Sequence, residues 1–427
     1  MRLARGKPTT EGARQRRAPL RDSSRLRADG VAHEVELRNA RPVADALRAV
    51  MPEWGIVATG TATDGARPAS RVTGSGTERY AFRSRWAAHS LSGLGLAGAT
   101  CGVVADLVQA FCDERPGVLG LHCGAVRIGG RLVAFTGPFR AGKTTLVTRL
   151  GLEPCVTFFC DDILPILADG QAVALGIQPR LRLPLPAMTG SGFRAAVQSG
   201  LTVSDSRYGF VRLDSQAPRG TLGRLAALNV LDPRENTPPR LHPIYTAGAA
   251  GHLIRQNIAD PGDVPHHFDR IAGLAASLQC LTLVFSDLED AAQLLLRTFA
   301  GNTAIDTLID PAPAEPAPPP APQAPPADLS RRVVREPRIV LRQIGGDSFL
   351  WQVEERRFFR LNPLAAAVWR LLGRPVGGTA LVSILSEVFP EVDQRRIAGD
   401  VGALLGELEQ ARLVRTVARR SGPRSRG

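Results

Sequence analysis

The stretch Gly137-Pro138-Phe139-Arg140-Ala141-Gly142-Lys143-Thr144-Thr145 fits the pattern G-x-x-x-x-G-K-[ST], which is typical of loops that hold phosphate groups. The apolar run 131–136 leads into it and residues 145–150 lead out, so the sequence predicts a strand, a glycine loop and a helix in that order. Such a loop points successive backbone N–H groups and a helix N-terminus at a polyphosphate. The residues expected to line a nucleoside triphosphate site are Gly137, Arg140, Ala141, Gly142, Lys143, Thr144 and Thr145.

Composition also supports Lys143 as a functional residue of the loop. It is one of two lysines among 53 basic residues, the other being Lys7, so lysine stands where the phosphate chemistry calls for it. We expect its ammonium group to reach the terminal phosphates and the Thr144 hydroxyl to ligate Mg²⁺. The alternative is a chance glycine-rich turn before a helix.

A second acidic signal follows the loop. The β-rich run 156–160 ends directly in Asp161 and Asp162. In open α/β sheets ligands lie at the carboxyl ends of strands, where carboxylates can hold Mg²⁺ or take a proton from an attacking hydroxyl. We assign Asp161 as the base and Asp162, with Thr144, as the metal ligand, although the pattern also allows the reverse. The structural alternative is an Asp pair that caps a turn.

The charge distribution argues against a specific nucleic-acid partner. The net charge of +13 is concentrated at the ends: residues 1–29 carry +6 and residues 415–427 carry +5, which leaves +2 for the body. We therefore expect a disordered basic arm over 1–30 and a disordered basic tail over 418–427.

Cysteine usage and hydropathy indicate a cytoplasmic protein. The six cysteines form no C-x-x-C pair or zinc spacing, which predicts reduced and mostly buried thiols. The basic N-terminus is not followed by an apolar signal-peptide region, and no membrane span is expected. Nothing in the sequence decides between a monomer and a homo-oligomer.

Composition divides the middle of the chain. An α+β portion over 31–116, with a helix over 99–112, should pack on an α/β domain over 117–310. Residues 311–330 are rich in proline and alanine and predict an extended polyproline II linker. The arginines of the Pro-punctuated segment 178–186 could face phosphate or solvent, and His266-His267, without metal-ligand spacing, are expected at the surface.

The C-terminal part, 331–417, predicts a small winged-helix-like α+β module. Its expected strands are 338–343, 349–353 and 357–361, and its expected helices are 363–372, 379–388 and 393–411. Asn362 should cap the first helix, with Pro363 at its first position. The module carries no catalytic constellation, which favours a binding role.

Residues 117–300 resemble the α/β P-loop kinase domain of HPr kinase/phosphorylase and its shorter relatives in peptide-modification gene clusters. The matching features are His122, the loop 137–145 and Phe159-Cys160-Asp161-Asp162. The resemblance implies binding of ATP or another nucleoside triphosphate with Mg²⁺, phosphoryl transfer to a serine hydroxyl by the Asp pair, and an orienting role for His122. The glycine-rich segment that the family uses for the phosphorylase activity and for HPr is absent, so neither is expected.

The C-terminal module resembles the PqqD family, the recognition element for ribosomally made precursor peptides. The resemblance rests on Phe359 to Asn362, on Ala366 to Trp369, and on the closing apolar residues Leu405, Leu408, Leu413 and Val414. It implies that a leader peptide adds as a strand beside 357–361 and packs against 393–411.

Together these patterns predict a Mg²⁺- and nucleotide-dependent kinase for a hydroxyl, expected to be that of a serine, on a captured precursor peptide. The linker would raise the effective concentration of the peptide at the kinase site. Two alternatives remain: a P-loop NTPase that delivers the peptide to another enzyme, and a peptide-binding chaperone with a degenerate kinase half. A winged-helix DNA binder is disfavoured by the nearly neutral body.

Overall fold

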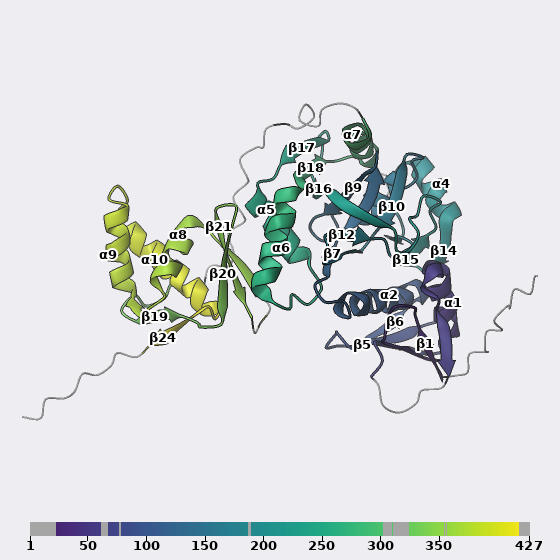
Figure 1. Cartoon of the computed structure of the whole chain (residues 1–427), viewed down its shortest axis with the longest axis horizontal. Coiled ribbons are helices and arrows are strands. Elements are labelled where there is room, and N and C mark those ends of the chain that lie inside the picture. The colour runs from purple at the N-terminus through teal and green to yellow at the C-terminus, as the bar shows by residue number, and fades with distance from the viewer. Residues whose placement is uncertain are drawn as a thin grey trace, which may run out of the picture. The chain divides into compact units, whose positions relative to one another are not determined.

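The computed structural model describes residues 23–60, 67–76, 78–186, 189–301, 310, 324–353, 355 and 357–417 (Figure 1). The chain forms two compact units, which interleave along the sequence. The first comprises Met1–Val118, Thr144–Pro165 and Val173–Leu222, and the second comprises Leu119–Lys143, Ile166–Ala172 and Gly223–Gly427. The expectations for residues 1–22, for 418–427 and for most of the predicted linker, 311–323, lie outside the described residues.

The N-terminal part of the first unit is a six-stranded sheet in the order β3-β1-β2-β4-β5-β6. Its strands are β1 (Ser23–Arg27), β2 (Val35–Arg38), β3 (Val57–Gly60), β4 (Ser70–Gly74), β5 (Tyr80–Ser84) and β6 (Leu91–Leu94), and its helices are α1 (Arg41–Val50), the short η1 (Pro52–Trp54) and α2 (Leu96–Asp113). The prediction of disorder up to residue 30 is wrong for β1. This strand is central in the sheet, because it pairs with both β2 and β3.

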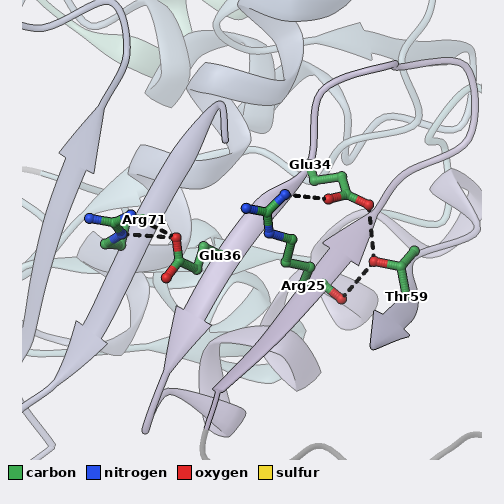
Figure 2. Close-up of polar contacts among 5 residues, drawn as sticks. All are labelled: Arg25, Glu34, Glu36, Thr59 and Arg71. Atoms are coloured by element: carbon green, nitrogen blue, oxygen red, sulfur yellow. Dashed lines mark hydrogen bonds and ion pairs between the residues drawn. The ribbon is translucent and has the colours of Figure 1, made fainter. Parts of the chain in front are cut away.

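Charged side chains cross-link this sheet (Figure 2). Arg25 donates to Glu34 at 3.0 Å, and Arg71 contacts Glu36 at 2.9 Å. Burial alone would raise the pKa of Glu36, but the hydrogen bonds from two arginines lower it below its ordinary value. Arg25, which was predicted to lie in a disordered basic arm, therefore contributes to the sheet.

α2 is the core helix of this part. It packs against α1 and the sheet so closely that a Cβ on Gly102 would lie 2.9 Å from the Phe82 ring. Among the described residues it alone is long and apolar enough to cross a membrane, yet 56% of it is buried inside the fold. This burial is what a core helix requires, and the expected helix over 99–112 is confirmed and slightly extended.

The rest of the first unit carries the Asp pair. It contains most of α3 (Lys143–Leu150), β10 (Val156–Cys160), β13 (Arg180–Arg182), α4 (Ser191–Gly200), β14 (Leu201–Ser204) and β15 (Tyr208–Val211). β11 (Ile163–Ile166) and β12 (Gln171–Val173) form a hairpin where the chain passes between the units. The expected strand over 156–160 that ends in acid is confirmed.

The second unit contains the sheet that carries the phosphate loop. β8 (Gly124–Ile128) and β9 (Arg131–Thr136) form the expected hairpin around Gly129-Gly130, and β9 runs parallel to β16 (Leu222–Pro233). β16 pairs in parallel with β18 (Gln279–Phe285), which pairs antiparallel with β17 (Arg240–Pro243). The remaining elements are β7 (Leu119–His122), α5 (Thr246–Gln256), α6 (Val264–Ser277) and α7 (Leu288–Ala300).

The C-terminal module has the predicted three strands and three helices. The strands β20 (Ile339–Ile344), β21 (Asp347–Gln352) and β22 (Arg357–Leu361) form a meander, followed by α8 (Pro363–Leu371), α9 (Gly378–Val388) and α10 (Gln394–Gln410). The Asn362 side chain caps α8 by accepting from the Ala365 amide at 2.8 Å. A second sheet of β23 (Val376–Gly377), β19 (Arg332–Arg335) and β24 (Val414–Val417) was not foreseen.

The module also begins earlier than composition indicated. Ala327, inside the predicted linker, donates its amide to the Gly402 carbonyl of α10 at 2.9 Å. A Cβ on Gly406 would collide with the Pro325 carbonyl, so this part of the chain lies directly on α10. The stretch 324–330 therefore packs as part of the module although its composition resembles a spacer.

Candidate active site

The phosphate loop has the backbone that its glycines allow. Gly137 has φ of 152° and Gly142 has φ of 91°, values that side chains rarely adopt. A Cβ on Gly137 would lie 3.0 Å from the Leu231 carbonyl of β16, so this glycine also permits close packing. Arg140 takes φ of 70°, which is a strained conformation for a non-glycine residue. Strain of this kind is tolerated where function over-determines the backbone.

The side chains of the loop divide into two groups. Ala141 is buried and its amide donates to the Pro138 carbonyl at 3.1 Å, which closes the turn. Lys143 lies at the first position of α3, and its Nζ reaches the Gly137 carbonyl at 3.4 Å across the loop. Phe139 and Arg140 project outward, with the Phe139 side chain 76% exposed. The ammonium group is therefore folded over the loop where a phosphate chain would pass.

A further acid, Asp232, lies at the edge of the sheet where β9 leads into the phosphate loop. It was not among the predicted site residues. β16 runs parallel to β9 with Val230 beside Thr136, so Asp232, near the carboxyl end of β16, lies two residues beyond the level at which β9 ends and the loop begins. Asp232 is paired with Arg234 at 2.6 Å. The signal was present in the sequence, because the apolar run 222–231 ends in an acid as the run 156–160 does.

In the first unit, the Asp pair meets Thr144 and Arg180. Asp161 Oδ2 accepts a hydrogen bond from the Arg180 amide at 2.9 Å, whereas its Oδ1 is buried and accepts none. Burial raises the pKa of Asp161 to about 6, Asp162 adds to this, and the Thr144 hydroxyl and the Arg180 amide oppose it. Asp162 is exposed. The inner carboxylate is thus held by the backbone and presents one unpaired oxygen.

The question of where Arg180 points is settled by the fold. Its guanidinium donates to the Cys101 thiol of α2 and lies over the Tyr208 ring at 4.8 Å, beside the Asp pair. Burial raises the pKa of the Cys101 thiol to about 11, and the positive charge of Arg180 opposes the rise. Arg182, two residues along the strand, is exposed. One of the two arginines therefore faces the acids and the other faces solvent.

The residues present fit a magnesium ion. Among the described residues no three Asp, Glu, His or Cys side chains gather as a self-sufficient metal cluster. Mg²⁺, however, is usually held by one or two carboxylates together with substrate phosphates and water. Asp162 and Thr144 carry oxygen donors of this kind.

The predicted histidine lies at the end of β7 in the second unit, and His122 is half-buried there. Its orienting role stays a prediction. The expectation that His266 and His267 both lie at the surface is wrong in part, because His267 is 4% exposed and only His266 faces solvent. Burial lowers the pKa of His267 to about 4, so this ring is neutral. Its burial results from the C-terminal module.

The meander of the module is covered on two faces. One face, through Leu350 and Leu361, belongs to the apolar core of α8, α9 and α10. On the opposite face, Trp351 contacts the rings of His267 and Phe268 on α6, with centroid separations of 6.5 and 6.3 Å. The module is therefore seated on α5 and α6.

Two contacts of arginine side chains also join the module to α5 and α6. Arg342 of β20 pairs with Asp269 of α6 at 3.6 Å, and Arg255 of α5 lies over the Phe358 ring at 5.9 Å. β22, the strand predicted to receive a leader peptide, is the outer strand of the meander. The edge of the sheet, rather than its faces, is thus the part open to strand addition.

Comparisons with known proteins bear on both halves. The family model "Coenzyme PQQ synthesis protein D (PqqD)" matches residues 348–414, which confirms the resemblance of the C-terminal module. A solved structure, the Hpr(Ser) kinase/phosphatase from Coxiella burnetii, matches with 13% identity and a TM-score of 0.22, over 43% of this chain and 94% of that chain. No curated protein matches the chain in sequence. The evidence for catalysis therefore lies in the residues of the loop and the Asp pair.

Proposed function

We propose that this chain is a kinase that uses Mg²⁺ and a nucleoside triphosphate, preferably ATP, to phosphorylate a hydroxyl group of a ribosomally made precursor peptide. The observation that carries the proposal is the Asp161 carboxylate. It lies beside Thr144, the residue that follows the phosphate-loop lysine, and keeps one buried oxygen without a hydrogen bond. A nucleotide site with an acceptor of protons next to it is what phosphoryl transfer to a hydroxyl requires.

The loop would bind and orient the triphosphate. The N–H groups of the loop, apart from that of Ala141, which donates to the Pro138 carbonyl, and the Lys143 ammonium group would offer positive charge to the β- and γ-phosphates. This stabilisation matters most in the transition state, where charge spreads over the oxygens of the transferred group. A bound Mg²⁺, held by Asp162 and Thr144, would supply further neutralisation of that charge.

Asp161 would act as the base. The Arg180 amide fixes one of its oxygens, so the other is oriented toward the incoming hydroxyl. As the hydroxyl oxygen bonds to the γ-phosphorus, the bond from that phosphorus to the bridging oxygen of the nucleoside diphosphate breaks. The hydroxyl proton passes to Asp161. The products are a phosphorylated peptide and a nucleoside diphosphate.

The PqqD-like module would supply the peptide. In this proposal the leader segment adds as a strand along β22, where backbone hydrogen bonds give affinity and side-chain pockets give specificity. The module is seated on α5 and α6, in the unit that also carries Lys143. A captured peptide would therefore be held by a fixed element, not only by a linker that raises its effective concentration.

The test is a mass measurement. The chain is incubated with Mg-ATP and a precursor-like peptide encoded beside its gene, and the peptide should gain about 80 Da, the mass of one phosphoryl group. Lys143→Ala and Asp161→Asn should each abolish the gain while peptide binding, measured by fluorescence anisotropy, is retained. Nucleotide hydrolysis with an unmodified peptide would favour a delivery NTPase, and normal phosphorylation by either variant would contradict the site assignment.

A further inference from the structure

A pocket opens beside Asp161, between α2 and the segments that follow β10 and β12. Its cavity volume is about 50 Å³, which is room for a few water molecules or one small side chain. One wall is formed by Val104, Ala105 and Val108 of α2. The N-terminal α+β portion of the chain therefore contributes to the candidate active site.

The lining of the pocket is mostly apolar, and its polar side chains are the two acids, Arg180, Gln178 and the Cys101 thiol. Carbon atoms of Leu175, Ile177 and Phe210 complete the walls that α2 begins. Asp161 and Asp162 both line the pocket. The Oδ1 atom of Asp161, a residue of this lining, is buried without a hydrogen bond, and such an unsatisfied acceptor is costly until a ligand donates to it.

The charges in the pocket restrict its ligand. Arg180 lies beside the pair, but its guanidinium already donates to Cys101 and stacks on Tyr208. An anionic side chain would face two carboxylates, and burying its charge against apolar walls would be unfavourable. The complementary group is an uncharged donor on an aliphatic body.

We propose that this pocket binds the accepting residue of the peptide, a serine or threonine with apolar neighbours, and that α2 selects it. The proposal rests on the proposed kinase function and deepens it. The hydroxyl donates to Asp161 Oδ1, and the surrounding carbon atoms contact Val104 and Val108. Val104 is a specificity residue in this arrangement and has no part in the chemistry.

The experiment uses blocked tripeptides with Ser or Thr in the centre, flanked by Leu or by Asp, and radiolabelled Mg-ATP. Val104→Trp fills the pocket from the half-exposed face of α2. Gln109→Trp adds the same bulk to α2 at a half-exposed position that does not line the pocket. Circular dichroism and the KM for ATP are measured for all three proteins.

The wild-type chain should label Leu-flanked peptides at least tenfold better than Asp-flanked ones in kcat/KM. It should prefer Thr to Ser about fourfold, the factor that one more buried methyl group contributes. Val104→Trp should raise the KM for peptide at least tenfold and leave the KM for ATP unchanged, whereas Gln109→Trp should behave as wild type.

The outcomes separate this proposal from the function on which it rests. A wild-type chain that hydrolyses ATP but labels no peptide contradicts the kinase function itself. Labelling that is equal in Val104→Trp and Gln109→Trp overturns only the pocket assignment. A raised KM for ATP in Val104→Trp would show that the pocket holds the nucleotide base instead.

Discussion

Replacing Asp106 by Asn should change the stability of the first unit in a pH-dependent way. The free energy of unfolding of the variant, relative to wild type, should be higher at pH 8 than at pH 4. Asp106 lies on α2, is 7% exposed, and accepts hydrogen bonds from the Ser70 and Ser84 hydroxyls at 2.8 Å each. Burial raises the pKa of Asp106 to about 6, and the two hydroxyls only partly oppose this. The residue holds the pocket-forming helix on its sheet, so its ionisation bears on the site.

The magnitude follows from the difference between the folded pKa and the ordinary value of 3.8. Between these values the folded chain keeps a proton that the unfolded chain has released. The stabilisation is complete below about pH 4 and is lost as the pH rises through about 6. Two pKa units correspond to about 3 kcal/mol. Asn cannot ionise, so the variant should not lose this free energy between pH 4 and pH 8.

The assay is urea unfolding at pH 4 and pH 8, followed by the fluorescence of the four tryptophans, of which Trp54 is fully buried in the same unit. The free energy of unfolding of Asp106→Asn minus that of wild type should rise by about 2–3 kcal/mol between the two pH values. Asp113→Asn makes the same chemical change at the exposed end of α2 and should show no such rise. An equal difference at both pH values for Asp106→Asn would refute the assignment of a costly buried charge.

Three further outcomes are expected. Gly142→Ala should weaken binding of a fluorescent ATP analogue about tenfold, because φ of 91° costs a side chain about 1–3 kcal/mol, while Gly130→Ala at the β8–β9 turn, with φ of 83°, should leave affinity intact. Trp351→Ala should lower the free energy of unfolding of the module, measured by thermal unfolding, by about 3–5 kcal/mol and separate its unfolding from that of α6. Val353→Ala, at a residue that is 43% exposed, should have neither effect. Asn362→Ala should cost about 1 kcal/mol in urea unfolding of the module, through loss of the α8 cap, and unchanged stability would contradict the capping geometry.

Local patterns predicted the elements that carry the site. The strand, loop and helix over 131–150 follow from an apolar run, two glycines and a helical segment adjacent in sequence, and the acid-terminated strand before Asp161 follows from the same logic. The capped α8 and the meander of the module were likewise predicted from Asn362-Pro363 and alternating apolar residues. Each of these signals is contained within about ten residues, where chain geometry restricts the outcome.

The features that were predicted wrongly depend on contacts with other segments of the chain. β1 was assigned to a disordered arm because its arginines raise the local charge, yet Arg25 is neutralised by Glu34. His267 was expected at the surface, yet its ring contacts Trp351, more than eighty residues later in the chain. Composition cannot report such contacts, because it does not specify which segments meet.

By itself, the sequence determined the strand, glycine loop and helix over 131–150, an acid pair after a strand, and a PqqD-like module. These depend on residue type and short spacing. Tertiary structure decided that Asp161 keeps a buried, unpaired oxygen, that Arg180 turns toward Cys101, and that α2 forms the wall of the adjacent pocket. The physical reason is that burial and desolvation arise only when segments far apart in the chain pack together, and these determine what the acid pair can bind.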